Sequence, residues 1–240
     1  MKKHIPNIIT LFNLMSGLIA LFYIFQKQWL LAFAFVLLGI LFDFFDGLAA
    51  RTLNVSSAVG LQLDSLADMV TSGVVPAFAM FFLLQNTLQV DLTQGISFDF
   101  KHLAPFIGLF ISLGSAYRLA KFNVDERQST SFIGLPTPAN TLFIMSLPLI
   151  AYHQDIIDLN SFLLNPYTLI AISLLSAYML NAELPLFSLK FKDFSWQNNK
   201  EKFILVGLSL VLIPTLQFIS IPLIIIIYVI LSLIFKTEKA

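Results

Sequence analysis

Apolar runs of about the length that crosses a bilayer recur along the whole chain, and they constrain the fold more than any other feature. A membrane-spanning helix needs about 17–25 consecutive, mostly apolar residues. Eight such runs occur, at 6–25, 29–50, 60–84, 104–122, 137–153, 166–182, 203–218 and 220–235. Only 12% of the 240 residues are charged, against about 25% in soluble domains. We therefore predict an all-α integral membrane bundle of about eight transmembrane helices, the last two forming a tight hairpin.

Basic residues are distributed unequally between the two predicted sides of the membrane. An even number of spans places both termini on one side. With the termini inside, only Lys27 and Lys101 of the 14 Lys and Arg residues fall in outside loops. Inside loops carry an excess of Lys and Arg. The pattern predicts a multi-pass protein of the cell (inner) membrane, with both termini in the cytoplasm.

Several function classes are excluded by composition. The chain has no cysteine, which excludes disulfides, thiolate catalysis and thiolate metal sites. His4, His102 and His153 lie far apart in the sequence and near predicted helix ends, so a histidine metal site is not expected. The net charge is zero, which gives no bulk attraction to nucleic acid. Any bound metal should therefore have oxygen ligands.

Four aspartates, Asp43, Asp46, Asp64 and Asp68, are the only acidic residues well inside predicted spans. Each charged residue at the centre of a membrane helix costs roughly 2.5–3.5 kcal/mol on insertion scales. No Lys or Arg lies within these two spans to compensate, and Arg51 lies only at a boundary. Bound metal cations would therefore compensate the negative charges of the four aspartates.

The spacing of the aspartates supports a shared metal site. Asp43 and Asp46 are three residues apart, and Asp64 and Asp68 are four apart, so each pair shares one helix face. The short connection between the two spans makes them antiparallel neighbours. The four carboxylates can then converge, and oxygen ligation suits Mg²⁺ or Mn²⁺. Two divalent ions would balance four negative charges.

Small residues accompany the acidic faces. Asp43 lies eight residues before Arg51, about 12 Å at 1.5 Å per residue, which predicts a site open to the cytoplasm. Gly47, Ala50 and Gly60 leave room for a nucleotide or its phosphates to approach the backbone. Arg51, at the cytoplasmic opening of this predicted site, can pair with a phosphate.

Together these residues spell one continuous motif, Asp43-x2-Asp46-Gly47-x2-Ala50-Arg51-x8-Gly60-x3-Asp64-x3-Asp68. With every position and every spacing kept, it resembles the signature of the CDP-alcohol phosphotransferase family. The resemblance covers about residues 5–185 and implies a six-helix transmembrane core at 1–185. A cytoplasmic loop and an additional transmembrane hairpin would then occupy 186–240.

Further segments resemble the serine-using members of this family. They are 6–14, 63–68 with 73–77, 118–123 and, above all, Phe132-Ile133-Gly134-Leu135-Pro136-Thr137-Pro138-Ala139. Two positions depart from that pattern, because Lys121 replaces an expected arginine and Asn140 replaces a usual small residue. The resemblance also implies a homodimer.

The resemblance implies a role for each motif residue. Asp43, Asp46 and Asp64 would ligate metal, and Asp68 would ligate the second ion and act as general base. The CDP part would be held by Gly47, Ala50, Arg51 and Gly60, with Asn13 and Thr10 from the first helix as further contacts. The implied reaction is CDP-diacylglycerol plus L-serine giving phosphatidylserine and CMP. The candidate partners of the serine carboxylate are Arg118 and Lys121.

Other functions stay open at this point. Within the family, the acceptor could be glycerol 3-phosphate or inositol phosphate, or the donor could be an ether lipid. An ion-coupled transporter is a different class that also uses intramembrane carboxylates. Transporters usually show repeated halves around a midplane site. Here the acids lie on two consecutive spans without a matching pair later in the chain, which disfavours transport.

Overall fold

The computed structural model describes residues 4–55, 57–125, 132–154, 156–188, 195–197 and 199–236. Several basic residues used to predict the membrane orientation lie outside these ranges, namely Lys2, Lys3, Arg127, Lys190, Lys192 and Lys239. Part of the cytoplasmic loop predicted within 186–240 also lies outside them.

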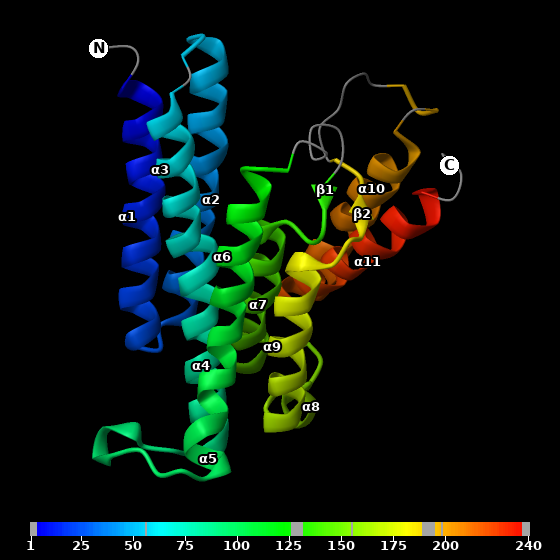
Figure 1. Cartoon of the computed structure of the whole chain (residues 1–240). Helices are drawn as coiled ribbons and strands as arrows, with labels where there is room; N and C mark the ends of the chain where they lie inside the picture. The colour runs from blue at the N-terminus through cyan, green and yellow to red at the C-terminus, as the bar shows by residue number, and fades with distance from the viewer. Residues whose placement is uncertain are drawn as a thin grey trace.

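Each predicted span coincides with a helix or a continuous run of helical segments. The long helices are α1 (Ile5–Phe25), α2 (Trp29–Thr52), α3 (Ala58–Asp68), α4 (Val75–Leu88), α6 (Phe110–Phe122), α7 (Thr137–His153), α9 (Pro166–Asn181), α10 (Lys200–Leu216) and α11 (Ser220–Lys236). The short helices are α5 (Phe100–Leu103) and α8 (Asn160–Leu163), at the lower end in Figure 1. The all-α fold is confirmed.

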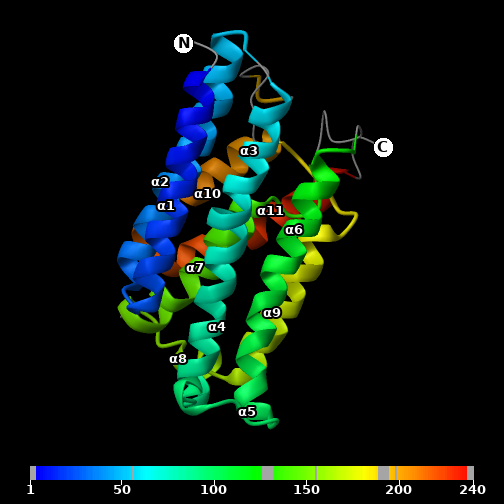
Figure 2. The same ribbon diagram turned by 60° about the vertical axis from the view of Figure 1, so that its left-hand side comes forward.

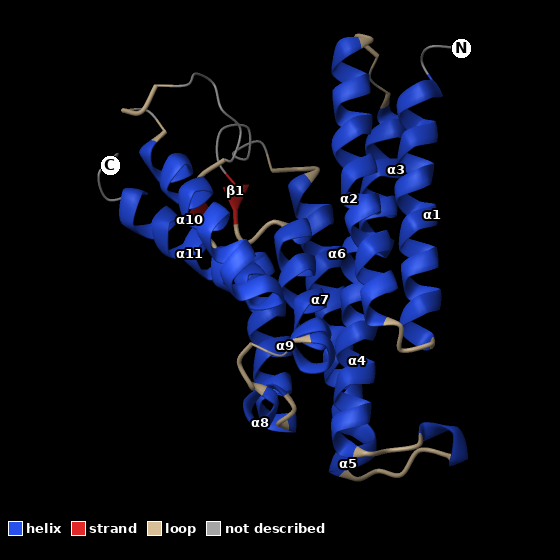
Figure 3. Ribbon diagram, turned by 180° about the vertical axis from the view of Figure 1, so that it is seen from behind, coloured by secondary structure: helices blue, strands red, loops and turns tan. Residues whose placement is uncertain are grey.

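The helices form a bundle with a distinct C-terminal hairpin. Helices α1 to α9 run roughly along one direction, whereas α10 and α11 cross the bundle obliquely (Figures 1 and 3). Five helical stretches of the described chain are long and apolar enough to cross a membrane. One of them, Lys200–Phe235, contains both predicted C-terminal spans. The shorter α9 is also apolar. The number of crossings stays a prediction.

On α1, the types of residue that are buried and exposed are the reverse of those on a helix of a soluble protein. Its buried face carries small and polar residues at helical spacing, namely Pro6, Thr10, Asn13, Gly17 and Ala20. Its exposed face carries large apolar residues, including Ile8, Leu11, Met15, Leu18 and Phe22. Small and polar residues are typical of helix contacts within a membrane. A lipid environment around the exposed face explains this arrangement.

Large apolar side chains fill the space between the central helices. One buried cluster joins α4, α6, α7 and α9 through Met80, Leu84, Ile111, Ile144 and Leu169. A second joins α1 and α2 to α4 and α7 through Ile24, Trp29, Val36, Ala79 and Met145. Because α4 and α7 take part in both clusters, they connect α1 and α2 to α6 and α9, which lie on the other side of α4 in Figure 2.

A six-residue π-helical segment, η2 (Met69–Val74), follows α3 directly, so the third predicted span is not a uniform α-helix. Such segments are rare and are frequently found at functional sites. The Thr71 hydroxyl donates to the Asn13 carbonyl at 3.1 Å. The Thr141 hydroxyl, from α7, lies 2.9 Å from the Ser72 carbonyl. Contacts from two other helices thus satisfy polar groups at this irregular turn.

Two glycines allow η2 to approach α1 and α2 closely. A Cβ on Gly17 would overlap the Thr71 side chain. A Cβ on Gly39 would lie 2.7 Å from Thr71 Cγ2. Since real Cβ atoms essentially never come this near, the Thr71 side chain would have to shift if either glycine carried a side chain.

A small antiparallel ladder was not predicted. The two-residue strands β1 (Phe132–Ile133) and β2 (Pro185–Leu186) pair at the end of the bundle where α7 begins. Gly134 follows β1 with a φ of +78°, a backbone conformation that favours glycine. Its N–H donates to the Leu184 carbonyl at 2.8 Å. The ladder therefore ties the 132–139 loop to the chain that leaves α9.

Candidate active site

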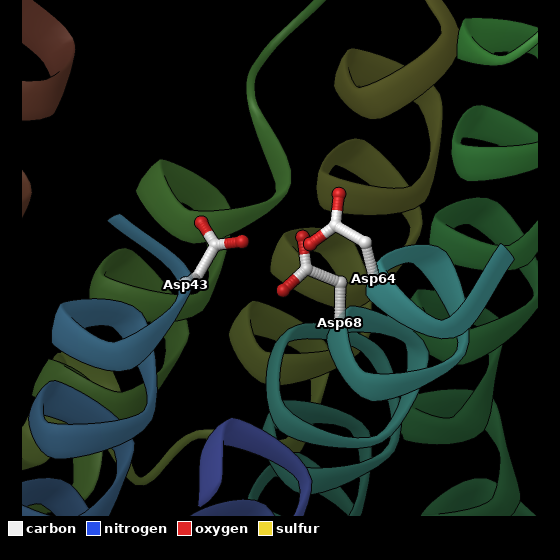
Figure 4. A group of neighbouring side chains, drawn as sticks. All are labelled: Asp43, Asp64 and Asp68. Atoms are coloured by element: carbon white, nitrogen blue, oxygen red, sulfur yellow. The ribbon is translucent and has the colours of Figure 1, made fainter. Parts of the chain in front are cut away.

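Three of the four aspartates meet between α2 and α3. One carboxylate oxygen from each of Asp43, Asp64 and Asp68 lies within 4.8 Å of the other two. Figure 4 shows Asp64 and Asp68 on the same side of α3, with Asp43 facing them from α2. The spacing of four within α3 and the antiparallel connection of the two helices produce this arrangement. All three side chains are partly buried.

Asp46 lies outside that group of three and has a partner of its own. Oδ2 of Asp46 lies 2.5 Å from Oγ1 of Thr10, and the Asp46 side chain is buried. The Thr10 hydroxyl is also 3.0 Å from the Pro6 carbonyl. Thr10, predicted to contact CDP, thus fixes a predicted metal ligand across the α1–α2 contact.

Asn13 is likewise engaged with an aspartate. Its Nδ2 donates to Oδ1 of Asp68 at 3.0 Å, and the side chain is fully buried. The second oxygen, Asn13 Oδ1, has no hydrogen-bond partner among the described residues. Asn13 therefore orients Asp68 in this structure and does not line the cavity beside it.

A cavity of about 600 Å³ adjoins the acidic group. Its wall contains six residues singled out from the sequence, Thr10, Asp46, Gly47, Ala50, Gly60 and Asp64. The volume lies within the range of about 300–1,000 Å³ typical of small-molecule sites. Four of the six predicted nucleotide contacts thus share one space with two acidic residues, whereas Arg51 and Asn13 are not among the lining residues.

The mouth of this cavity is formed by the end of α2 and the start of α3. Arg51 is exposed there, and its Nη1 lies 4.0 Å from where a Cβ on Gly47 would stand. Ser57 caps α3 by accepting a hydrogen bond from the Gly60 N–H at 2.9 Å. A Cβ on Gly60 would meet Ser57 Oγ at 3.0 Å and Asn7 Oδ1 at 3.1 Å. A larger residue than Gly60 would therefore narrow the mouth.

Arg118 and Lys121, the predicted serine contacts, lie in different environments. Arg118 is buried, and its Nη1 donates to the Ile133 carbonyl at 2.8 Å and to the Leu180 carbonyl at 2.9 Å. It thereby joins β1 to the end of α9. Lys121 is partly exposed, with its Nζ 3.7 Å from Oε1 of Glu183. In the described part of the chain, neither side chain forms an ion pair with the three aspartates.

The acidic group fits divalent metal ions. Among the described residues no Lys or Arg forms an ion pair with it. Asp64 Oδ1 is buried without a hydrogen-bond partner in the same part of the chain. Three carboxylates held this close repel one another unless cations lie between them. A donor set of oxygens only is the one that Mg²⁺ and Mn²⁺ prefer.

The sequence of this chain was compared with known families. The pattern of the family described as CDP-alcohol phosphatidyltransferase matches residues 3–185, which include all four aspartates and the cavity. The chain belongs to the CDP-alcohol phosphatidyltransferase family. The resemblance drawn from the motif is confirmed.

Relatives within the CDP-alcohol phosphatidyltransferase family include bacterial, archaeal and yeast proteins. A Bacillus subtilis protein is 36% identical over 140 residues, 57% of this chain and 70% of its own. A Helicobacter pylori protein is 27% identical over 219 residues, 90% of this chain and 84% of its own. A Methanocaldococcus jannaschii protein is 33% identical over 171 residues, 71% of this chain and 69% of its own. Each is named CDP-diacylglycerol–serine O-phosphatidyltransferase.

Sequence reasoning missed several residues that shape this family site. His4, Pro6, Asn7 and Ser57 line the cavity. Pro6 and Asn7 belong to the 6–14 segment noted from its resemblance, without a predicted role, and Ser57 carried a signal only as a helix cap. Asn123, at the end of α6, donates to Oγ of Ser65 at 2.8 Å, and Ser65 follows Asp64 on α3. Such pairings between distant segments leave no mark in local sequence.

Proposed function

We propose that this chain transfers the phosphatidyl group of CDP-diacylglycerol to the hydroxyl of L-serine, giving phosphatidylserine and CMP. The observation that carries the proposal is the meeting of Asp43, Asp64 and Asp68 beside a cavity lined by Gly47, Ala50 and Gly60 of the family motif. The names of the relatives support serine as the acceptor.

The proposed ion site uses the four aspartates. Asp43, Asp64 and Asp68 would bind divalent ions directly, and Asp46, oriented by Thr10, would complete the set for a second ion. When bound, Mg²⁺ or Mn²⁺ would neutralise the pyrophosphate and stabilise the departing CMP. The cavity walls at Gly47, Ala50 and Gly60 would hold the nucleotide, with Arg51 pairing with a phosphate at the mouth.

Asp68 is the proposed general base. Its Oδ1 accepts the hydrogen bond from Asn13, so Oδ2 is the oxygen left to take the proton of the serine hydroxyl. The serine oxygen would then bond to the phosphorus that carries the diacylglycerol, and the bond from that phosphorus to the CMP oxygen would break. The proton rests on Asp68 and CMP leaves with the bond's electron pair.

The serine carboxylate needs a cation near the acceptor position. Lys121 is the more available of the two candidates, because Arg118 already donates to two backbone carbonyls through Nη1. Lys121 has partial exposure and only a long ion pair with Glu183. Arg118 would contribute through its remaining N–H groups and by fixing the 132–139 loop, which resembles serine-using members.

The proposed setting is the cell (inner) membrane, with both termini and the active site facing the cytoplasm and the chain acting as a homodimer. Basic residues of the predicted inside loops support the orientation. The family match ends at residue 185, where we place the boundary between the transferase core and the C-terminal hairpin.

An acceptor screen with purified full-length protein tests the proposal. CMP release from CDP-diacylglycerol would be followed with L-serine, glycerol 3-phosphate and inositol phosphate, each with and without Mg²⁺ or Mn²⁺. We expect metal-dependent release with serine alone. CMP release with another acceptor would assign that compound, in place of serine, as the acceptor. A preference for a CDP-linked dialkyl lipid would assign an ether lipid, in place of the diacyl lipid, as the donor. No release, together with ion flux in liposomes, would favour a transporter.

A further inference from the structure

Helix α11 of the C-terminal hairpin binds the backbone of the residue that follows β2. The buried Tyr228 on α11 donates its hydroxyl hydrogen to the Phe187 carbonyl at 2.9 Å. The Phe187 N–H donates in return to Ser232 Oγ, one turn further along α11, at 3.4 Å. The rings of Phe187 and Tyr228 also meet edge to face, with centroids 4.9 Å apart. Both hydrogen-bonding groups of the Phe187 backbone are therefore bound by α11.

Apolar contacts extend this attachment to both strands of the small ladder. Leu135, in the 132–139 loop just after β1, and Leu186, in β2, are buried in one cluster with Ile225 and Tyr228 of α11. In Figure 1, β2 lies beside α11. The hairpin thus packs against the loop that resembles serine-using members, as well as against the strand that pairs with it.

The ladder in turn packs tightly around Arg118. Nη1 of Arg118 donates to the Ile133 carbonyl in β1 and to the Leu180 carbonyl at the end of α9. The Gly134 N–H donates to the Leu184 carbonyl just before β2 at 2.8 Å. A Cβ on Gly134 would lie only 2.9 Å from Arg118 Nη1. Because no free space separates these groups, a displacement of β2 would displace the guanidinium.

The same loop leads toward the proposed base. It continues directly into α7, where the Thr141 hydroxyl lies 2.9 Å from the Ser72 carbonyl. Ser72 is one helical turn beyond Asp68. The contacts from α11 therefore reach both the candidate cation for the serine carboxylate and the segment that follows the base.

We propose that Tyr228 is a positioning residue for the acceptor. By holding the chain after β2, it fixes the ladder, and with it Arg118, in the orientation that binds the serine carboxylate. This inference rests on the proposed function, in which serine is the acceptor. The described residues that line the cavity at the acidic group all lie at or before Asp64. The C-terminal hairpin therefore serves the serine side of the reaction and leaves the CDP side unaffected.

Two-substrate kinetics on the full-length protein test the role of Tyr228. Tyr228→Phe removes the hydroxyl and keeps the ring, so we expect KM for serine to rise about fivefold, the effect of one neutral hydrogen bond. The KM for CDP-diacylglycerol should stay unchanged, which a general loss of structure would not produce. Tyr178→Phe is the matched control, because that side chain on α9 is 66% exposed.

A double variant shows whether Tyr228 acts through Arg118. Arg118→Lys keeps the positive charge but loses the forked geometry of the guanidinium. If the hydroxyl of Tyr228 only orients Arg118, adding Tyr228→Phe to Arg118→Lys should raise KM for serine no further. Residues that act independently would instead multiply their effects.

Hydrogen exchange provides a readout that does not depend on the reaction. The N–H groups of Gly134 and Leu135 both donate to backbone carbonyls at or just after the end of α9. In detergent, Tyr228→Phe should speed exchange of the peptide that contains these two groups about fivefold. Tyr178→Phe should leave that exchange rate unchanged.

The outcomes separate this inference from the proposed function. No serine-dependent CMP release from the unaltered protein would overturn the proposed function and the serine role of Tyr228 together. With release present, three results would overturn the inference alone. These are an unchanged KM for serine in Tyr228→Phe, an equal rise of KM for both substrates, and an unchanged exchange rate at Gly134 and Leu135.

Discussion

Asn13 and Asp68 lie 55 positions apart in the sequence, yet Asn13 Nδ2 donates to Asp68 Oδ1 at 3.0 Å. The hydrogen bond joins the first helix to the last residue of α3, immediately before the π-helical segment. It occupies one oxygen of the proposed base and leaves the other for chemistry. The orientation of Asp68 therefore depends on a residue that contributes no charge to the site.

Replacing Asp68 by Asn should separate binding from turnover. Because Asn cannot take the serine proton, we expect CMP release to fall at least about hundredfold, within the range for a lost general base. Binding of CDP-diacylglycerol, measured directly, should persist. Asp158→Asn is the matched control, since Asp158 accepts the Asn160 N–H just before α8, a turn hydrogen bond that the asparagine side-chain oxygen can also accept. Near-normal turnover in Asp68→Asn would remove it from the base role.

Replacing Asn13 by Leu should lower kcat without weakening CDP-lipid binding. The variant keeps the volume but frees the Asp68 carboxylate, so we expect a loss of about tenfold in kcat at nearly unchanged KM for CDP-diacylglycerol. Steady-state kinetics measure both. Ser16→Ala, which removes a hydroxyl bonded within α1, is the control. A raised KM with intact kcat would instead support the predicted contact between Asn13 and CDP.

Replacing Arg118 by Ala should destabilise the protein and impair serine use. The buried carbonyl of Leu180 and the partly buried carbonyl of Ile133 lose their donor, at about 1–3 kcal/mol for a fully buried unsatisfied group. We also expect KM to rise more for serine than for CDP-diacylglycerol. Thermal unfolding in detergent and two-substrate kinetics measure these effects.

Lys121 provides the comparison for Arg118. Lys121→Ala should raise KM for serine while changing stability by less than about 1 kcal/mol, as for an exposed ion pair. Glu183→Gln removes the same ion pair but keeps the cation, so it should leave KM for serine unchanged. An equal effect of Lys121→Ala on both substrates would count against a serine site at this position.

Gly17→Ala should lower stability because the new Cβ overlaps the Thr71 side chain. Overpacking of this kind costs about 1–3 kcal/mol, and displacement of η2 should also reduce activity. Gly207→Ala is the matched control on α10, where a Cβ meets nothing within 4 Å. Thermal unfolding of the two variants in the same detergent decides the matter. Equal stability would mean that α1 and η2 separate easily.

Removing divalent ions with a chelator should abolish CMP release and lower the unfolding temperature. Without cations, Asp43, Asp64 and Asp68 repel one another at close range. Mg²⁺ or Mn²⁺ should restore both properties. In the double variant Asp43→Asn, Asp64→Asn the metal should no longer raise the unfolding temperature. Full activity in the chelator would contradict a metal-dependent site.

Local features of the sequence predicted the helices well. Apolar runs placed a helix at every predicted span, since burial in lipid requires long apolar segments. Some helix ends were predicted wrongly by a few residues. The third span was predicted at 60–84, but α3, η2 and α4 together form a helical stretch over 58–88. The predicted span 104–122 begins earlier in the structure, at Phe100.

The candidate site was predicted in part. The spacing of Asp64 and Asp68 placed them on one face of α3, because a helix repeats every 3.6 residues. Spacing could not show that Asp46 would turn to Thr10, or that Arg118 would join Ile133 to Leu180. Those outcomes depend on how neighbouring helices are rotated and packed.

The sequence by itself determined the membrane character, the oxygen donors of the predicted metal site and the family. The length of the apolar runs, the absence of cysteine and the spacing of the motif are all properties of the chain alone. The tertiary structure alone decided which carboxylates meet and which residues orient them. It also decided that α3 continues into a π-helical turn, where Thr71 approaches Gly17 and Gly39. Such contacts join residues dozens of positions apart, and only the packing of whole helices brings them together.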